Sequence, residues 1–358
     1  ILGGSEPGVS NIEDVQLNFS NADAMMDAIV SANSAPEVNI RVRGHVFVWH
    51  SQTPTWFFRE GLKSDGAYVT PEEMNKRMEW YIKSVAQHFD TKYPGLIYAW
   101  DVVNEAANDG GGPRTNGDWY GVYQSWDFIP KAFEYADKYL AKDTILFYND
   151  YNECTPTKCD QIVEFLKEIR KHISKDRTLG AGMQGHHDMA TPTLEMIEAA
   201  TRAYAANADV VHITELDVKS TMGYVDSPEA RVVEYTQQGH RYKEIYNMIK
   251  RVNAETGNKV TNITIWGTDD RNSWLKTSNS VGGSADGKTP QFPLLFDEDL
   301  KVKPAYWAFV DQNKLEPAIN AVNAMNTDDP KYASENVAKK ADGTAWFKFK
   351  SYWANGKL

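Results

Sequence analysis

An alternation of two patterns along the chain most constrains its fold. Apolar runs rich in Val, Ile and aromatic residues recur, and a longer stretch of helical periodicity follows each one. This alternation is typical of βαβ units that build a parallel sheet. The predicted strands are Ile40–Trp49, Leu96–Glu105, Thr144–Asp150, Thr178–His186, Val210–Val218 and Val260–Thr268.

Helical periodicity fills the intervals between these strands, and several of the predicted helices begin with Pro in the first turn, where helix starts favour it. The predicted helices are Asn21–Ala32, Pro71–Phe89, Trp126–Leu140, Asp160–His172, Thr193–Ala205, Pro228–Val252 and Pro304–Asp311. The fold class is therefore α/β, and we expect a (β/α)8 TIM barrel over residues 1–312. Such a barrel has about eight strands, so the first two are expected to be missing from this sequence.

Beyond residue 312 the alternation stops, and we treat residues 313–358 as a C-terminal tail. Its last segment, Thr344–Trp353, alternates aromatic residues with Lys and predicts one exposed strand. The net charge of −11 argues against a protein that binds nucleic acid through Lys and Arg clusters. No apolar run approaches the roughly 20 residues of a membrane-spanning helix, so no membrane insertion is expected.

The chain holds 11 Trp and 18 Tyr, and flat aromatic faces are surfaces on which sugar rings stack, although an isolated Trp usually packs in the core. Only two cysteines occur, Cys154 and Cys159. They form neither a disulfide framework nor a zinc-binding pattern, and we expect both to be free thiols.

Acidic side chains stand at the ends of two predicted strands. Asp101 and Glu105 share a face of one strand by alternation, and Glu215 and Asp217 share a face of another, three strands later. Active sites of parallel barrels lie at the carboxyl ends of the strands. Two carboxylates on an otherwise apolar strand have to be paired or functional, so either pair could instead be a buried ion pair that joins neighbouring strands.

Opposed carboxyl groups across a barrel mouth are what glycoside hydrolysis requires. One carboxylic acid protonates the leaving oxygen while the other group stabilises or attacks the anomeric carbon. A separation of about 5–5.5 Å gives retention of configuration and about 6.5–9.5 Å gives inversion. The sequence does not measure this separation.

Six motifs in order carry a resemblance to a known family. They are Arg43-Gly-His45-Val-Phe-Val-Trp49-His50-Ser-Gln52-Thr-Pro-Thr-Trp56, Trp100-Asp-Val-Val-Asn-Glu105, Tyr148-Asn-Asp-Tyr-Asn152, Gln184-Gly-His186, Thr214-Glu-Leu-Asp217 and Trp266-Gly-Thr-Asp followed by Ser273-Trp274. From about Asn21 to Asp311 the chain closely resembles the family 10 glycoside hydrolases, the endo-β-1,4-xylanases. The family's Glu-Asn-x-Met-Lys stretch at the end of its second strand has no counterpart here, which again points to missing first strands.

The resemblance implies a role for each matching residue. Glu105 is expected to be the general acid/base and Glu215 the nucleophile, while Asn104 touches the 2-hydroxyl of the sugar at the cleavage point. His186 and Asp217 are expected to hold the nucleophile in register, and Asp101 to bond His45. The other expected substrate-binding residues are His45 under the cleaved sugar, Trp49 on the same side of its strand, Gln52 as a glycone contact, Trp266 and Trp274 as glycone walls, Tyr151 as a platform past the cleavage point, and Gln184.

No metal and no cofactor are expected. His186, His187 and Asp188 are consecutive, but neighbours on a strand point to opposite faces and no His-x-His pair occurs. His50 stands at odd spacing from His45 and is expected to point away from the site. Two Gly-rich loops, Ala107–Trp119 and Lys276–Phe292, lie next to the catalytic regions and are expected to shape the cleft.

The expected function is therefore endo-acting hydrolysis of internal β-1,4-xylosidic bonds of xylan, with retention by double displacement. A related β-glycanase that acts on cellulose or mannan is one alternative, and a non-catalytic sugar-binding barrel is the other. A polymeric substrate implies an extracellular or cell-surface setting, and we expect a monomer.

Overall fold

The computed structural model describes residues 1–221, 223, 225–276, 290–315, 334–339 and 345–351. The chain divides into two compact units. The first comprises Ile1–Asp217 and Asn247–Trp266, and the second comprises Val218–Tyr246 and Gly267–Leu358.

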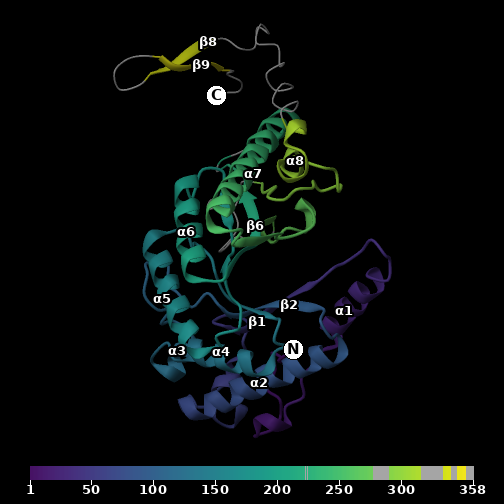
Figure 1. Ribbon diagram of the computed structural model, residues 1–358, viewed down its shortest axis with the longest axis vertical. Helices are drawn as coiled ribbons and strands as arrows, with labels where there is room; N and C mark the ends of the chain where they lie inside the picture. The colour runs from purple at the N-terminus through teal and green to yellow at the C-terminus, as the bar shows by residue number, and fades with distance from the viewer. Residues whose placement is uncertain (222, 224, 277–289, 316–333, 340–344, 352–358) are drawn as a thin grey trace. The chain divides into compact units, whose positions relative to one another are not determined.

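A parallel sheet organises the first unit (Figure 1). Its strands are β1 (Val42–Trp49), β2 (Ile97–Asn104), β3 (Ile145–Asp150), β4 (Leu179–Met183), β5 (His186–Asp188), β6 (Val210–Lys219) and β7 (Val260–Ile265). Their order is β1-β2-β3-β4-β6-β5, and β7 also pairs with β6. The six predicted strands are confirmed, and each parallel pair joins strands in the order that the alternation predicts.

Contacts across its interior show that this sheet curls. Arg43 on β1 contacts His212 on β6, with 2.9 Å between Nη1 and Nδ1, although β2, β3 and β4 separate the two strands in the sheet. The ring of His45 on β1 lies 6.1 Å from the ring of Trp266, which follows β7. Burial and the charge of Arg43 lower the pKa of His212 to about 3, so His212 is neutral inside the barrel.

Helices alternate with the strands, as predicted. They are α1 (Ser20–Ala32), α2 (Pro71–Lys92), α3 (Asp118–Tyr123), α4 (Phe128–Tyr139), α5 (Pro156–His172), α6 (Leu194–Asn207), α7 (Pro228–Thr256) and α8 (Pro304–Val310). The short 3₁₀ helices are η1 (Ile12–Asp14), η2 (Thr55–Phe58), η3 (Glu60–Leu62), η4 (Asp270–Asn272), η5 (Trp274–Lys276) and η6 (Gln312–Lys314).

The outer helices pack side by side, with α2 against α4, α4 against α5 and α5 against α6 (Figure 1). Helix α2 begins where the sequence indicates, because the Thr70 hydroxyl accepts from the Glu73 amide and Pro71 occupies the first turn. Its buried side is apolar, with Met74, Met78 and Ile82 among its members. This burial against the sheet provides most of the stability of such a helix.

Two local details differ from the sequence-based expectation. Helix α3 was not predicted, because it is a short segment that begins at the end of the Gly-rich loop Ala107–Trp119. The predicted strand Thr178–His186 is interrupted after Met183, where Gly185 adopts a φ of +77°. A Cβ atom at Gly185 would lie 2.9 Å from Ile213 Cγ2, so both the conformation and the space favour glycine there.

In the second unit, a buried ion pair connects distant segments. Lys303 Nζ lies 2.8 Å from Asp270 Oδ2 and donates to the Phe292 carbonyl at 2.7 Å. Burial lowers the pKa of Lys303 to about 8 although Asp270 opposes this effect. Farther along the chain, β8 (Ser334–Lys339) and β9 (Ala345–Ser351) form an antiparallel pair, and β9 confirms the strand predicted at 344–353.

Several expectations concern residues that the structure does not describe or test. Most of the predicted loop Lys276–Phe292 lies outside the described residues. The division of the chain at residue 312 and the two strands expected before β1 stay predictions. Neither Cys154 nor Cys159 forms a disulfide, as predicted, and both thiols are buried.

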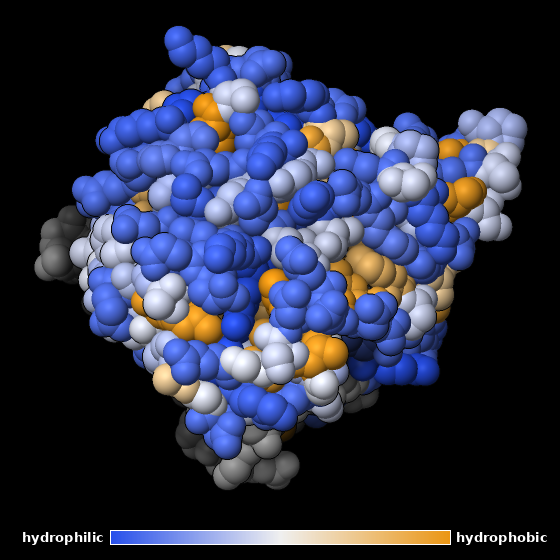
Figure 2. All heavy atoms as spheres, turned by 90° about the horizontal axis from the view of Figure 1, so that it is seen from below, coloured by the Kyte–Doolittle hydropathy of each residue, from blue (hydrophilic) through white to orange (hydrophobic). Residues whose placement is uncertain are grey.

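The surface agrees with the mean hydropathy of −0.54. On the face shown in Figure 2, hydrophilic residues predominate and hydrophobic ones are scattered between them. None of the described helices is long and apolar enough to cross a bilayer.

Candidate active site

The two predicted catalytic carboxylates both lie in the first unit, at the carboxyl ends of strands. Glu105 directly follows β2, and Glu215 stands in the second half of β6. Their side chains are 13% and 7% exposed, respectively. Both are therefore largely buried at the end of the sheet where the loops after parallel strands gather.

A chain of amide side chains joins the two carboxylates. Gln184 Nε2 donates to Glu105 Oε1 at 2.9 Å and to Asn104 Oδ1 at 3.2 Å. Asn149 Nδ2 in turn donates to Asn104 Oδ1 at 3.0 Å and to Glu215 Oε1 at 2.8 Å. Four hydrogen bonds thus link Glu105 to Glu215, so the structure brings together residues that are 110 positions apart in the sequence.

The backbone explains how Asn104 and Glu105, although neighbours, both reach this network. Strand alternation would place adjacent side chains on opposite faces. Glu105 has a φ of +58°, a left-handed conformation that is uncommon for a residue other than glycine. Its amide still donates to the Asn149 carbonyl at 2.9 Å, and Asn104 Nδ2 donates to Glu105 Oε1 at 3.2 Å. Such an outlier held in place by its surroundings is a feature of functional sites.

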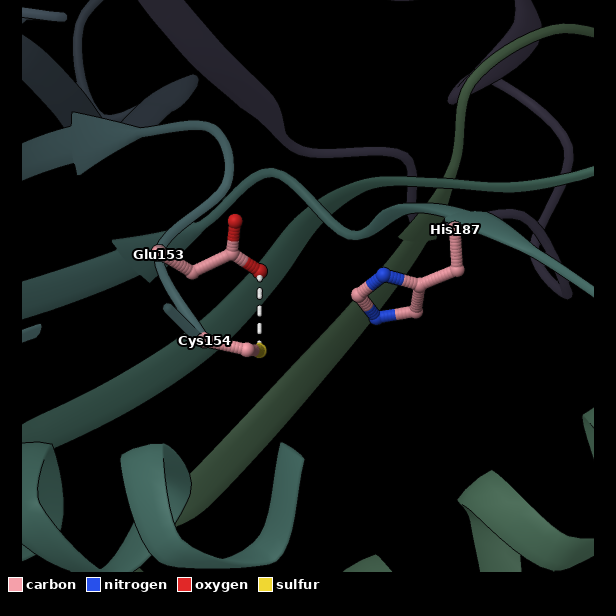
Figure 3. A group of neighbouring side chains, drawn as sticks. All are labelled: Glu153, Cys154 and His187. Carbon is pink, nitrogen blue, oxygen red and sulfur yellow. Dashed lines mark hydrogen bonds between the residues drawn. The ribbon is translucent and has the colours of Figure 1, made fainter. Parts of the chain in front are cut away.

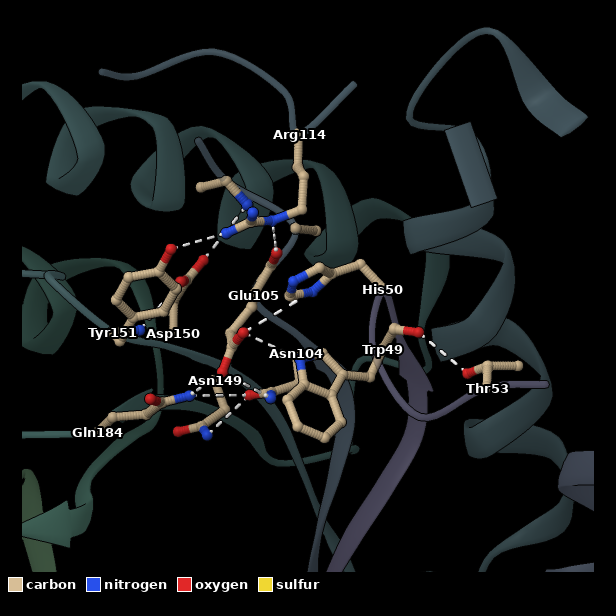
Figure 4. Close-up of polar contacts among 12 residues, drawn as sticks. Trp49, His50, Thr53, Asn104, Glu105, Arg114, Asn149, Asp150, Tyr151 and Gln184 are labelled. Carbon is tan, nitrogen blue, oxygen red and sulfur yellow. Dashed lines mark hydrogen bonds and ion pairs between the residues drawn. The ribbon is translucent and has the colours of Figure 1, made fainter. Parts of the chain in front are cut away.

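Three further side chains surround Glu105 (Figure 4). Trp49 Nε1 donates to Glu105 Oε2 at 2.9 Å, and Arg114 Nε donates to the Glu105 carbonyl at 2.7 Å. His50 Nδ1 lies 3.7 Å from Glu105 Oε2, so the expectation that His50 points away from the site is wrong. The strand ends at Trp49, and alternation no longer governs the direction of the next side chain. Burial and the charge of Arg114 lower the pKa of His50.

Glu215 is held from its other side by a histidine. His186 Nε2 lies 3.2 Å from Glu215 Oε2, and His186 Nδ1 lies 2.9 Å from Asp217 Oδ1. Burial alone would lower the pKa of His186, but the charges and hydrogen bonds of Asp217 and Glu215 outweigh it and raise the pKa to about 10. At neutral pH an imidazolium therefore donates one hydrogen bond to each carboxylate.

A second histidine lies beside this group on the sheet. His45 Nδ1 lies 2.9 Å from Asp101 Oδ2, and Arg43 pairs with the same carboxylate. Burial opposes protonation of His45, yet its hydrogen bond to Asp101 and the nearby charges raise its pKa. Trp266 is 6.1 Å from the His45 ring and 6.4 Å from the His186 ring. His45, His186 and Trp266 thus gather beside the nucleophile candidate.

Past Glu105, Tyr151 is held by charged neighbours. Arg114 Nη2 donates to the Tyr151 hydroxyl at 2.9 Å, and Lys158 Nζ lies 3.6 Å from the centre of the Tyr151 ring. Lys158 is fully buried and pairs with Asp150 Oδ1 and Asp109 Oδ1, both at 2.9 Å. This cation joins the loop after β2 to the end of β3 beneath the aromatic ring.

Two predicted substrate-binding residues are not brought into these contacts. Gln52 is exposed, with a φ of +58°, in the bend after β1. Trp274 begins η5 in the second unit. Their roles stay predictions.

Sequence reasoning missed several residues that the structure places at the site. Asn149 belongs to the motif Tyr148-Asn-Asp-Tyr-Asn152. Its position one residue before Asp150, at the end of a predicted strand, could have indicated a role at the site. Arg114 and Lys158 had no such signal, because one lies in a Gly-rich loop and the other in the first turns of α5. Only the folded backbone brings these two cations to the strand ends.

A profile described as "Glycosyl hydrolase family 10" matches residues 7–312. The chain belongs to this family. The barrel fold and the glycosidase class follow from membership. It is 35% identical over 294 residues to an endo-1,4-beta-xylanase of Geobacillus stearothermophilus, which covers 80% of this chain and 81% of that protein.

Other relatives are longer. The chain is 34% identical over 323 residues to endo-1,4-beta-xylanase A of Thermotoga neapolitana, covering 88% of this chain but 27% of that protein. Among solved structures, it resembles the CBM22-1 and GH10 modules of a Clostridium thermocellum endo-1,4-beta-D-xylanase in complex with xylohexaose. That comparison has a TM-score of 0.70 at 29% identity and covers 86% of this chain and 59% of the other.

Proposed function

We propose that this family 10 glycosidase is an endo-1,4-β-xylanase that hydrolyses internal bonds of xylan with retention, using Glu215 as nucleophile and Glu105 as acid/base. One observation carries the proposal: two largely buried carboxylates from strands far apart in sequence meet at the same sheet edge, linked through Gln184, Asn104 and Asn149. Relatives named as endo-1,4-beta-xylanases support the choice of polymer.

In the first step Glu215 attacks the anomeric carbon as a carboxylate. Asn149 and His186 each bond one of its oxygens, which fixes the direction of attack. Because His186 is protonated at neutral pH, it places a positive charge beside the nucleophile. Glu105 transfers its proton to the leaving glycosidic oxygen as that bond breaks, and the sugar remains attached to Glu215 as an ester.

In the second step Glu105, now a carboxylate, removes a proton from a water molecule. The water attacks the anomeric carbon, the ester bond to Glu215 breaks, and the product leaves with the original configuration. Asn104 is placed by its bonds to Glu105, Gln184 and Asn149, and its amide binds the 2-hydroxyl of the sugar, a contact that strengthens in the transition state.

The remaining predicted contacts lie around the scissile bond. His45 binds beneath the cleaved sugar, Gln52, Trp266 and Trp274 bind the glycone side, and Tyr151 stacks on the sugar beyond the cleavage point. Trp49 and Gln184 are the other substrate-binding residues. Xylan is a polymer, so the enzyme acts outside the cell or at its surface. It works as a monomer, since both carboxylates come from one chain, and it needs no cofactor for these two steps.

The test compares Glu105→Gln, Glu215→Gln and the control Glu79→Gln, which changes a carboxylate on α2 outside the site. Initial rates are measured on xylan and on an aryl xylobioside with a good leaving group. Glu215→Gln should lose both activities, Glu105→Gln should lose far more on xylan, and Glu79→Gln should retain both. Near-normal turnover by Glu215→Gln would remove the nucleophile assignment.

Two further measurements separate the alternatives. The first product from the aryl xylobioside, observed by NMR, should be the β-anomer, and an α-anomer would refute retention. Rates on cellulose and mannan should fall well below the rate on xylan, and a comparable or higher rate on either would favour a different β-glycanase. Sugar binding without any hydrolysis would favour a non-catalytic barrel.

A further inference from the structure

A second cluster of potential ligand atoms lies in the first unit, outside the proposed catalytic contacts. Glu153, Cys154 and His187 each present one ligand atom, and all three atoms lie within 4.8 Å of one another. In Figure 3 the carboxylate, the thiol and the imidazole point toward the same place. Two of these residues follow β3 and the third belongs to β5, so the cluster joins the ends of two strands.

Strand alternation separates this cluster from the catalytic one. His186 faces Glu215 and Asp217, whereas His187, the next residue on β5, faces Glu153 and Cys154. The two adjacent histidines therefore contact different sets of side chains on opposite sides of β5. The spacing of His186, His187 and Asp188 does not predict this cluster, because His187 meets residues of another loop.

Few interactions offset the free-energy cost of burying the Glu153 carboxylate. The residue is 1% exposed, and a thiol hydrogen bond from Cys154 reaches it at 3.7 Å. Among residues 1–221 and the other described segments, no basic side chain forms an ion pair with it. A buried carboxylate without a cation is costly, and a bound cation would remove that cost.

The donor set selects the kind of cation. Thiolate, imidazole and carboxylate together suit a borderline-soft divalent ion such as Zn²⁺, whereas Ca²⁺ and Mg²⁺ require oxygen ligands. Zinc bonds of about 2.0–2.3 Å in a tetrahedron place ligand atoms about 3.3–3.6 Å apart. The distance of 3.7 Å between Cys154 Sγ and Glu153 Oε1 is already close to that spacing.

We infer that Glu153, Cys154 and His187 form a structural Zn²⁺ site that ties the loop after β3 to β5. Binding releases the thiol proton to solvent, because the thiolate is the ligand. The site has no part in the proposed hydrolysis. It braces the segment that begins with Tyr151 against the strand that carries His186, and adds the free energy of metal binding to that of folding.

The experiment uses the whole protein, treated with a chelator, dialysed and then supplied with Zn²⁺ alone. We expect about one Zn²⁺ per chain after a second dialysis, by elemental analysis, and a Tm that rises with Zn²⁺ concentration. Substitution by Co²⁺ should give the absorption band of a cobalt thiolate. Cys154→Ser and His187→Gln should lose the bound metal, the cobalt band and the rise in Tm.

Two control variants separate this site from other binding. Cys159→Ser removes the other buried thiol, which is outside the cluster, and should bind Zn²⁺ as the original protein does. His172→Gln disrupts a surface histidine that pairs with Glu134 and Glu168, and should also bind normally. The inference is overturned if no Zn²⁺ is retained, if Cys154→Ser binds it unchanged, or if His172→Gln abolishes binding. Every readout is metal binding, so the outcome of this experiment does not depend on the proposed xylanase activity.

Discussion

Replacing Asn149 by alanine should impair catalysis more than stability. Asn149 is fully buried, and its amide nitrogen donates to Glu215 and to Asn104. The bond to the ionised Glu215 belongs to the class worth about 1.5–3 kcal/mol. If the full free energy of this bond stabilises the transition state, kcat/KM should fall about 10- to 150-fold, since each 1.36 kcal/mol changes the rate by about a factor of ten.

The matched control is Asn253→Ala. Asn149 accepts a third side-chain hydrogen bond from Thr214 Oγ1 at 2.6 Å. Asn253 makes two, to the amide and the carbonyl of Val260 at 2.8 Å each, and Val260 is the first residue of β7. It therefore lies at the amino end of the sheet, where substitutions affect stability rather than catalysis. Each variant should lower Tm by a few degrees, because a lost bond between neutral groups costs about 1 kcal/mol and the lost bond to Glu215 about 1.5–3 kcal/mol.

The assay measures kcat/KM on an aryl xylobioside and on xylan, together with Tm by thermal unfolding, for both variants. Asn149→Ala should be slow on both substrates at temperatures where it is fully folded, while Asn253→Ala should keep its activity. Equal activities of the two variants would refute the reasoning that the Asn149 amide positions the nucleophile.

Three other changes test the electrostatics around the sheet. Because the pKa of His186 is raised to about 10, its stabilising contribution is complete below the unfolded value of about 6.5 and is lost as the pH rises through about 10. The difference in Tm between the original protein and His186→Gln should therefore shrink from pH 6.5 to pH 10, and a difference that grows would contradict the assignment. Lys158→Met leaves Asp150 buried without its cation. This variant should have a lower Tm, and a higher KM for xylan because Tyr151 is released. An unchanged Tm would show that the Lys158–Asp150 pair does not stabilise the loop that carries Tyr151. Arg177 is 1% exposed and pairs with Asp137. Arg177→Met should lower the free energy of unfolding, measured with urea, by about 3–5 kcal/mol. A loss of activity under conditions where this variant is fully folded would argue against a purely structural role for Arg177.

Most of the fold was predictable because its signals are local. Five of the six parallel strands lie within a predicted run, and β6 extends one residue past its run, to Lys219. Helices such as α2 begin at a Pro or a capping Thr that the sequence displays. The strand break at Gly185 was not predictable from periodicity. It depends on a close approach to Ile213, a residue of a neighbouring strand.

The site was predictable to the extent that it follows strand ends. Glu105, Glu215, Asn104, Gln184 and His186 were found because alternation and the family motifs mark them. His50 was assigned the wrong direction, since alternation fails once a strand has ended.

By itself, the sequence determined the alternation of strands and helices and the two carboxylates at strand ends, since apolar periodicity and strand position are properties of short segments. Only the tertiary structure decided what surrounds those carboxylates. Arg114 and Lys158 reach the site from a loop and a helix, and His187 meets Glu153 and Cys154 across two strands. These contacts depend on how the sheet curls. The curvature of the sheet results from the twist and register of every strand, so no single segment of sequence encodes it.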